Sequence, residues 1–261
     1  MKRYPIAIQI HCLREDFKEK PRETLLMIKE MGYDGVELNV GNLKLDEHPI
    51  EQYKAWLDEA GLECYSMMLK LESFAEEKKE ETLKMLLTLG VKNVVIGSVN
   101  FERLKEDPFG YANECVKEMT KMMELVRGYG IRAGYHAHDG DYLNLVGDVP
   151  FYEYVFMNTP EEFCMTIDTG NMMAGGADPI ECIKKFPGRA PIVHVKGYGK
   201  ELKYTTPVWQ SELDWEKFFT TARDEGEAEI FYIEFGARGG YTPVIRATLS
   251  CKWLEGWVER L

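Results

Sequence analysis

The sequence lacks paired cysteines and long apolar runs. Its six cysteines lie far apart in 261 residues: Cys12, Cys64, Cys115, Cys164, Cys182 and Cys251. Without a C-x-x-C pair they predict reduced core thiols and not a disulfide framework. No apolar stretch is long enough to span a bilayer, and the run before Gln9 is too short for the core of a signal peptide. We therefore expect a cytoplasmic protein with no membrane partner.

Positive charge is also scarce. The chain has 32 Lys and Arg residues against 44 Asp and Glu residues, and its formal net charge is −12. A nucleic-acid surface needs clustered cations, so we expect no nucleic-acid partner. A hydrophobic content of 45% indicates a folded chain with a sizeable core. The length suits one large α/β domain or two smaller ones.

Short apolar runs alternate with helical patterns from end to end. Eight runs are candidate strands: 5–10, 33–39, 62–69, 91–98, 131–138, 163–170, 191–198 and 229–236. The clearest helical pattern covers 111–128, where Cys115, Met119, Met122 and Val126 share one face. We interpret its methionines as core residues and not as a cofactor-binding segment.

Glycine follows several predicted helices just before the next strand, at Gly32, Gly61, Gly90 and Gly130. Eight strand–helix units predict a parallel sheet, and eight parallel strands close most economically into a single (β/α)8 TIM barrel over residues 1–261. A doubly wound open sheet is the alternative, but no G-x-G-x-x-G motif follows the first strand.

Polar residues cluster where four successive predicted strands end. These are His136, His138, Asp139 and Asp141 after strand 5, Asp168 after strand 6, His194 and Lys196 on strand 7, and Glu234 on strand 8. Active sites of such barrels lie at the carboxyl ends of the strands. Carboxylates mixed with imidazoles suit Mn²⁺, Zn²⁺, Mg²⁺ or Co²⁺, with Mn²⁺ or Zn²⁺ favoured. We therefore predict one divalent cation held by Asp168, His194, Glu234 and a strand-5 group.

Each of these residues also has a purely structural interpretation. Asp168 alone could cap the next helix, and His194 alone could be a core histidine bonded to a backbone carbonyl. Glu37 points inward by alternation on strand 2, where it could hydrogen-bond within the barrel or contact substrate. The joint occurrence of polar groups at four strand ends favours the site.

The motifs in order resemble those of a known family. They are IQIHCLR (8–14), MGYDGVEL (31–38), YHAHDGDY (135–142), IDTGN (167–171), VHVKG (193–197), and ELDWEKFFTTARDEG followed by YIEF (212–235). Together they resemble the sugar phosphate isomerase/epimerase group of xylose isomerase-like TIM barrels, which includes AP endonuclease family 2. The chain departs from the family pattern at Asp141, Asn171 and Gly197, where glutamate, histidine and aspartate are usual. With only five histidines in the chain, a trinuclear zinc nuclease site is not expected.

The resemblance implies a divalent-metal-dependent isomerase or epimerase of a ketose, sugar phosphate or related polyol that acts through a metal-stabilised enediolate. It implies Asp141, Asp168, His194 and Glu234 as metal ligands. Glu234 and Asp141 would act as general bases, with His138 as a further catalytic group. Substrate contacts would come from His136, His138, Lys196 and Glu37, and Arg14 or Arg238 would meet a terminal phosphate or carboxylate, although no glycine-rich phosphate cradle is present.

Two other functions stay open at this point. A dehydratase or lyase of a keto-inositol or keto-sugar needs the same cation and base, and a non-catalytic sugar-binding barrel would explain the three departures. The expected partner is a small-molecule sugar, and a homo-oligomer is an open alternative. The long segment 197–210 is predicted to be a lid, with Tyr198, Lys200 or Trp209 closing over the site.

Overall fold

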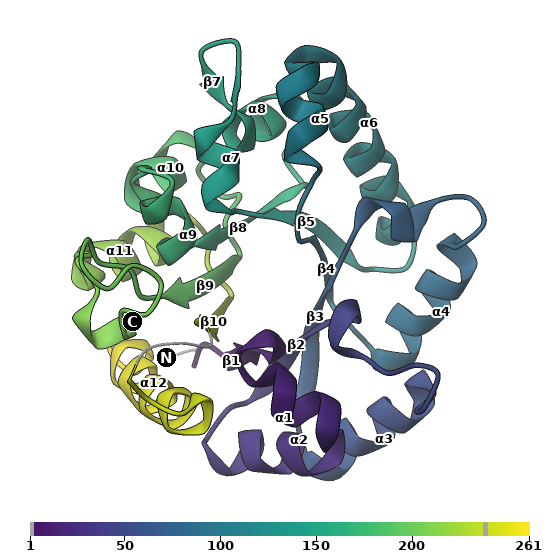
Figure 1. The fold of residues 1–261 in the computed structure, drawn as a ribbon, viewed down its shortest axis with the longest axis vertical. Coiled ribbons are helices and arrows are strands. Elements are labelled where there is room, and N and C mark those ends of the chain that lie inside the picture. The colour runs from purple at the N-terminus through teal and green to yellow at the C-terminus, as the bar shows by residue number, and fades with distance from the viewer. Residues whose placement is uncertain (1–2, 237–239) are drawn as a thin grey trace.

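Eight parallel strands close into a barrel in the computed structural model, which describes residues 3–236 and 240–261 (Figure 1). Around the barrel the order is β1, β10, β9, β8, β5, β4, β3 and β2. The strands are β1 (Ile6–Gln9), β2 (Gly35–Asn39), β3 (Glu63–Leu69), β4 (Asn93–Ile96), β5 (Arg132–His136), β8 (Cys164–Asp168), β9 (Ile192–Lys196) and β10 (Ile230–Glu234). Each falls inside one of the eight predicted runs, so the (β/α)8 prediction is confirmed.

Helices form an outer layer around the strands (Figure 1). The α-helices are α1 (Arg14–Glu19), α2 (Pro21–Glu30), α3 (Ile50–Ala60), α4 (Lys79–Leu89), α5 (Phe101–Glu106), α6 (Pro108–Arg127), α7 (Asp139–Leu143), α8 (Phe151–Asn158), α9 (Thr169–Ala174), α10 (Pro179–Lys185), α11 (Trp215–Asp224) and α12 (Pro243–Val258). The 3₁₀ turns are η1 (Ile10–Leu13), η2 (Val40–Asn42), η3 (Leu71–Phe74) and η4 (Val208–Gln210). Within the described residues, none of the helices has the length and apolar character needed to cross a membrane.

Glycines end the helices as the sequence predicts. Gly61 and Gly90 are the C-caps of α3 and α4, with φ of 65° and 69°. At Gly90 an added Cβ would meet no heavy atom within 4 Å. Glycine is therefore favoured there by the left-handed backbone and not by lack of space.

Apolar side chains cover both faces of the barrel, since parallel strands of this kind are buried on both faces. One apolar layer lies between barrel and helices, and it contains the predicted face of α6, with Met119 fully buried. The other fills the barrel interior: Ala7, Met68, Val95, Ile192, Ile230 and Tyr232. On β9 the inward positions run from Ile192 through His194 to Lys196. The interior thus changes from apolar to polar toward the carboxyl ends of the strands.

Between β5 and α8 the chain adds a feature that the sequence did not predict. Strands β6 (Leu145–Val146) and β7 (Val149–Pro150) pair antiparallel in a separate small sheet. The turn between them contains Gly147 at a φ of 64°. Strands of two residues are too short to produce an alternating pattern.

Candidate metal centre

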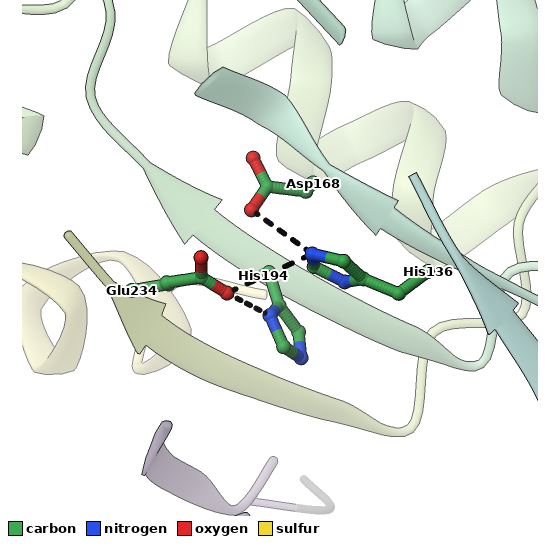
Figure 2. A group of neighbouring side chains, drawn as sticks. All are labelled: His136, Asp168, His194 and Glu234. Carbon is green, nitrogen blue, oxygen red and sulfur yellow. Dashed lines mark hydrogen bonds and ion pairs between the residues drawn. The ribbon is translucent and has the colours of Figure 1, made fainter. Parts of the chain in front are cut away.

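Four polar side chains from four neighbouring strands meet at the carboxyl end of the barrel (Figure 2). One ligand atom from each of His136, Asp168, His194 and Glu234 lies within 4.8 Å of the others. His136 Nε2 is 3.7 Å from Asp168 Oδ2 and 3.9 Å from Glu234 Oε2, and His194 Nδ1 is 2.6 Å from Glu234 Oε2. We call these four residues the metal-binding group.

Strand register brings these four residues together. Asp168 on β8 is the direct partner of His194 on β9, and His194 is in turn the partner of Tyr232 on β10. Glu234 follows Tyr232 by two residues and therefore points to the same interior face. His136 is the last residue of β5, the strand on the other side of β8. The pairing of the four strands therefore explains why the four side chains meet.

Asp168 serves two roles through its two oxygens. Its Oδ1 accepts a hydrogen bond of 2.7 Å from the backbone N–H of Asn171 and so caps α9. Its Oδ2 is buried and has no hydrogen-bond partner among the described residues. Burial raises the pKa of this carboxyl. The oxygen that faces His136 is therefore available to a cation, and the capping interpretation holds for the other oxygen.

Lys196 supplies positive charge to the same place. Its ammonium donates to Glu234 Oε1 at 2.8 Å and to Asn171 Oδ1 at 2.9 Å, and it lies 3.6 Å from Asp168 Oδ2. Although burial favours the neutral acid, Lys196 and His194 hold the pKa of Glu234 well below its ordinary value. Glu234 is thus a carboxylate at neutral pH.

The two histidines of the group differ in charge. Burial and the neighbouring His194 hold the pKa of His136 well below its ordinary value, so its ring is neutral and can offer a lone pair. For His194 burial acts in the same direction, but the carboxylates of Glu37 and Glu234 raise its pKa to about 10. A cation at Nδ1 would take the place of one proton of His194. With that exchange, the two imidazoles and two carboxylates fit a divalent cation with nitrogen and oxygen ligands.

Asp141 is not a member of the metal-binding group, contrary to expectation. Its Oδ1 accepts from Tyr135 Oη at 2.5 Å, and its Oδ2 accepts from the backbone N–H of His138 at 2.7 Å. Asp141 is the third residue of α7, and it closes a capping box with His138. Burial raises its pKa to about 7. The strand-5 member of the group is His136.

The other predicted residues lie at varying distances from the group. The ring of His138 has its centroid 4.7 Å from that of His136. Glu37 is fully buried, 3.2 Å from His194 Nε2. Arg14 pairs with Glu15 and contacts His11 in the segment after β1. Arg238 lies outside the described residues.

A pocket of about 220 Å³ opens at the carboxyl ends of β2 to β5. It is lined by Asn39, Val40, Gly41, Met68, Leu69, Lys70, Gly97, Ser98 and His138. A larger hollow of about 640 Å³ lies among η3, α4 and α6 in the outer layer. Neither hollow is lined by a member of the metal-binding group, but the smaller one is lined by His138, whose ring centroid is 4.7 Å from that of His136. The smaller pocket is therefore the one that lies next to the group.

The segment 197–210 approaches the group through Tyr204. Lys196 Nζ is 5.2 Å from the centroid of the Tyr204 ring, and the pKa of Tyr204 is raised by burial and by the side chain of Asp139. Of the residues predicted to close over the site, Tyr198 packs against Tyr204. Trp209 instead packs against Tyr241. Closure on ligand binding remains a prediction.

Asn171 is a member of the site that the sequence did not identify as functional. Its amide nitrogen donates to Ala137 O at 2.9 Å and lies 3.4 Å from His136 Nε2, while its oxygen accepts from Lys196. The amide thus orients both His136 and Lys196. The sequence does mark this position, because Asn171 stands in the IDTGN motif where the related family pattern has histidine.

The comparisons with known proteins agree with this architecture. The family model described as xylose isomerase-like TIM barrel matches residues 25–257, and the chain belongs to this family. No curated protein matches the chain.

Similar solved structures cover nearly the whole chain. A sugar phosphate isomerase/epimerase from Parabacteroides distasonis ATCC 8503 is 19% identical with a TM-score of 0.75, covering 98% of this chain and 94% of that one. The IolI protein with a bound zinc atom is 16% identical with a TM-score of 0.70, covering 98% of both chains. A D-allulose 3-epimerase from Methylomonas sp. is 16% identical with a TM-score of 0.69, covering 100% of this chain and 99% of that one. At these identities the likeness establishes the fold.

Proposed function

We propose that the protein is a divalent-metal-dependent isomerase or epimerase of a ketose, a sugar phosphate or a related polyol. The observation that carries the proposal is the meeting of two imidazoles and two carboxylates at the carboxyl end of the barrel. His136, Asp168, His194 and Glu234 would hold the cation, and their nitrogen and oxygen atoms favour Zn²⁺ or Mn²⁺. Similar structures include a sugar phosphate isomerase/epimerase, a D-allulose 3-epimerase and an IolI protein with a bound zinc atom, which supports this assignment.

Proton transfer would be the work of the chain's own side chains. A bound cation would supply Lewis acidity, which polarises a carbonyl and makes the adjacent C–H more acidic. Glu234 would accept that proton, since it is ionised and its side chain is 15% exposed, against 0–1% for the other three members. Lys196, bonded to Glu234, would stabilise negative charge that develops on the substrate oxygen.

A second proton carrier is needed when a proton moves between carbons or faces. The sequence predicts Asp141 in this role, but Asp141 is fully buried, does not line the pocket, and accepts from Tyr135 and from the backbone of His138. His138 lines the pocket, and burial lowers its pKa, so the ring is neutral and can accept a proton at neutral pH. We assign the second transfer to His138.

Solvent exchange tests the proposal. In D₂O with bound metal, the protein should exchange the proton next to the carbonyl of a suitable ketose or keto-sugar, because an enediolate precedes isomerisation, epimerisation and elimination alike. Glu234→Gln keeps an oxygen but removes the base, and exchange should fall by on the order of 10²–10⁴. Glu63→Gln is the matched control, since Glu63 is exposed at the opposite end of the barrel and should leave exchange unchanged.

Product analysis separates the alternatives. Loss of water from the substrate would identify the dehydratase or lyase, whereas an unchanged mass with altered configuration identifies the isomerase or epimerase. Tight ligand binding without exchange, across a broad panel of ketoses and keto-inositols with metal bound, would refute catalysis and support the sugar-binding barrel.

A further inference from the structure

A chain of buried polar side chains lies deeper in the barrel than the metal-binding group. Tyr232 Oη is 2.7 Å from Ser66 Oγ, and Ser66 Oγ donates to Glu37 Oε1 at 2.7 Å. The other oxygen of Glu37, Oε2, faces His194 Nε2 at 3.2 Å. All four side chains are fully buried. Only one of them, His194, belongs to the metal-binding group.

The hydrogen bonds of this chain have a defined direction. A carboxylate only accepts, so Ser66 gives its single proton to Glu37. Tyr232 must then donate to Ser66 Oγ. Glu37 Oε2 and His194 Nε2 have no hydrogen-bond partner among the described residues. A proton on His194 Nε2 would satisfy both of these buried atoms at once.

We propose that Glu37 is a positioning residue, held by Ser66 and Tyr232, that keeps the proton of His194 on Nε2 and leaves Nδ1 to the metal centre. The inference rests on the proposed function, since it assigns His194 a ligand role. Once a cation takes the place of one proton, His194 is a neutral imidazole with a single N–H, so the nitrogen that carries this proton toward Glu37 cannot be the one that binds the cation.

The orientation of the ring agrees with this assignment. Nδ1 faces Glu234, and Figure 2 shows the other ring nitrogen pointing away from the group. The pairing with His194 also argues against a substrate contact for Glu37. Because it is fully buried beside the ring of His194, it has no access to a substrate in the pocket. Of the two roles open for Glu37 from sequence, hydrogen bonding within the barrel is the one that fits.

The test measures metal binding and the state of the His194 ring, with Co²⁺ and Zn²⁺ as probes. Glu37→Gln keeps the size of the side chain and removes its charge. We expect the Kd for each ion to rise about 10–100-fold, as is typical when the outer partner of a metal-bound histidine is lost. The visible spectrum of the Co²⁺-loaded protein should change. The Nε2–H proton resonance of His194 in the Zn²⁺-loaded protein should shift or disappear from the NMR spectrum.

Thr166→Val is the matched control. Thr166 is a fully buried barrel residue whose hydroxyl has no hydrogen-bond partner in the described part of the chain. Removing that hydroxyl should leave Kd, spectrum and resonance unchanged. If Glu37→Gln does not fold, Ser66→Ala and Tyr232→Phe take its place. Both keep the carboxylate of Glu37, but each removes a hydroxyl from the chain of hydrogen bonds that holds it in place. Each should therefore raise the Kd for the ion by a smaller factor.

The outcomes separate this inference from the proposed function. If the wild-type protein binds one Co²⁺ or Zn²⁺ and the Glu37 variant matches it in Kd, spectrum and resonance, the positioning role is refuted and the metal site stands. A variant that is only less stable, with unchanged metal binding and NMR signals, would make Glu37 a purely structural residue and also refute it. If the wild-type protein binds neither ion, the proposed function and this inference fail together.

Discussion

Replacing Asp141 by Asn should show whether this residue is a structural acid or a metal ligand. Asp141 is fully buried, and its oxygens accept from Tyr135 Oη and from the backbone N–H of His138. The amide of asparagine resembles the protonated acid, because its oxygen can accept from the backbone while its nitrogen donates to the tyrosine oxygen. The Asp141→Asn variant should therefore keep the cap of α7 and abolish only the cost of burying a charge.

The magnitude follows from the pKa of Asp141. Burial raises it from 3.8 to about 7, so the folded protein holds this proton more tightly than the unfolded chain does. The associated stability is present at low pH and is lost as the pH rises through about 7. At 1.36 kcal/mol per pKa unit, the loss between about pH 5 and about pH 8 is on the order of 2–3 kcal/mol. Asparagine does not titrate, so the variant should not lose this stability as the pH rises.

Urea unfolding of both proteins without metal, followed by circular dichroism at the two pH values, measures this difference. The free energy of unfolding of Asp141→Asn minus that of the wild type should increase by about 2–3 kcal/mol from the lower to the higher pH. Other titrating groups cancel in the subtraction. A difference independent of pH would refute the reasoning. Loss of bound metal in the variant would restore Asp141 as a ligand.

Three further predictions concern the site. Asp168→Ala should abolish metal retention, measured by elemental analysis, while the far-ultraviolet circular dichroism spectrum stays native. The free energy of unfolding should fall by about 1 kcal/mol because the cap of α9 is lost. Full metal content in the variant would contradict the assignment. Adding metal at 100 times its Kd to chelator-treated protein should add about 2.7 kcal/mol of stability. That corresponds to a rise in Tm of about 5–11 °C, and an unchanged melting curve would count against the site. Saturating sugar ligand should alter Trp209 fluorescence and the hydrogen exchange of 197–210, and no change in either would exclude a lid.

The fold could be predicted because its physical causes are local. Strands buried on both faces appear as apolar runs, and left-handed C-caps at Gly61 and Gly90 favour glycine. The hairpin of β6 and β7 has no such signal, since its strands have two residues each.

The site could be predicted only in part. Asp168 and Glu234 are the final residues of their strands, and His194 lies two residues before the end of β9. Their inward direction follows from strand alternation. After β5 the sequence offers several polar residues within a few positions. Which one enters the group depends on where the strand ends and α7 begins. The capping turn directs Asp141 back to the backbone of His138 and leaves His136 inside the barrel.

The most direct test of the central claim is a crystal structure of the protein grown with Zn²⁺ or Mn²⁺ and measured by anomalous diffraction. The account predicts one strong anomalous peak among His136 Nε2, Asp168 Oδ2, His194 Nδ1 and an oxygen of Glu234, with zinc–ligand distances of about 2.0–2.2 Å. It also predicts that Asp141 keeps its bonds to Tyr135 and to the backbone of His138. A peak bound by Asp141, or no peak at the four residues in crystals that hold the ion elsewhere, would contradict the account.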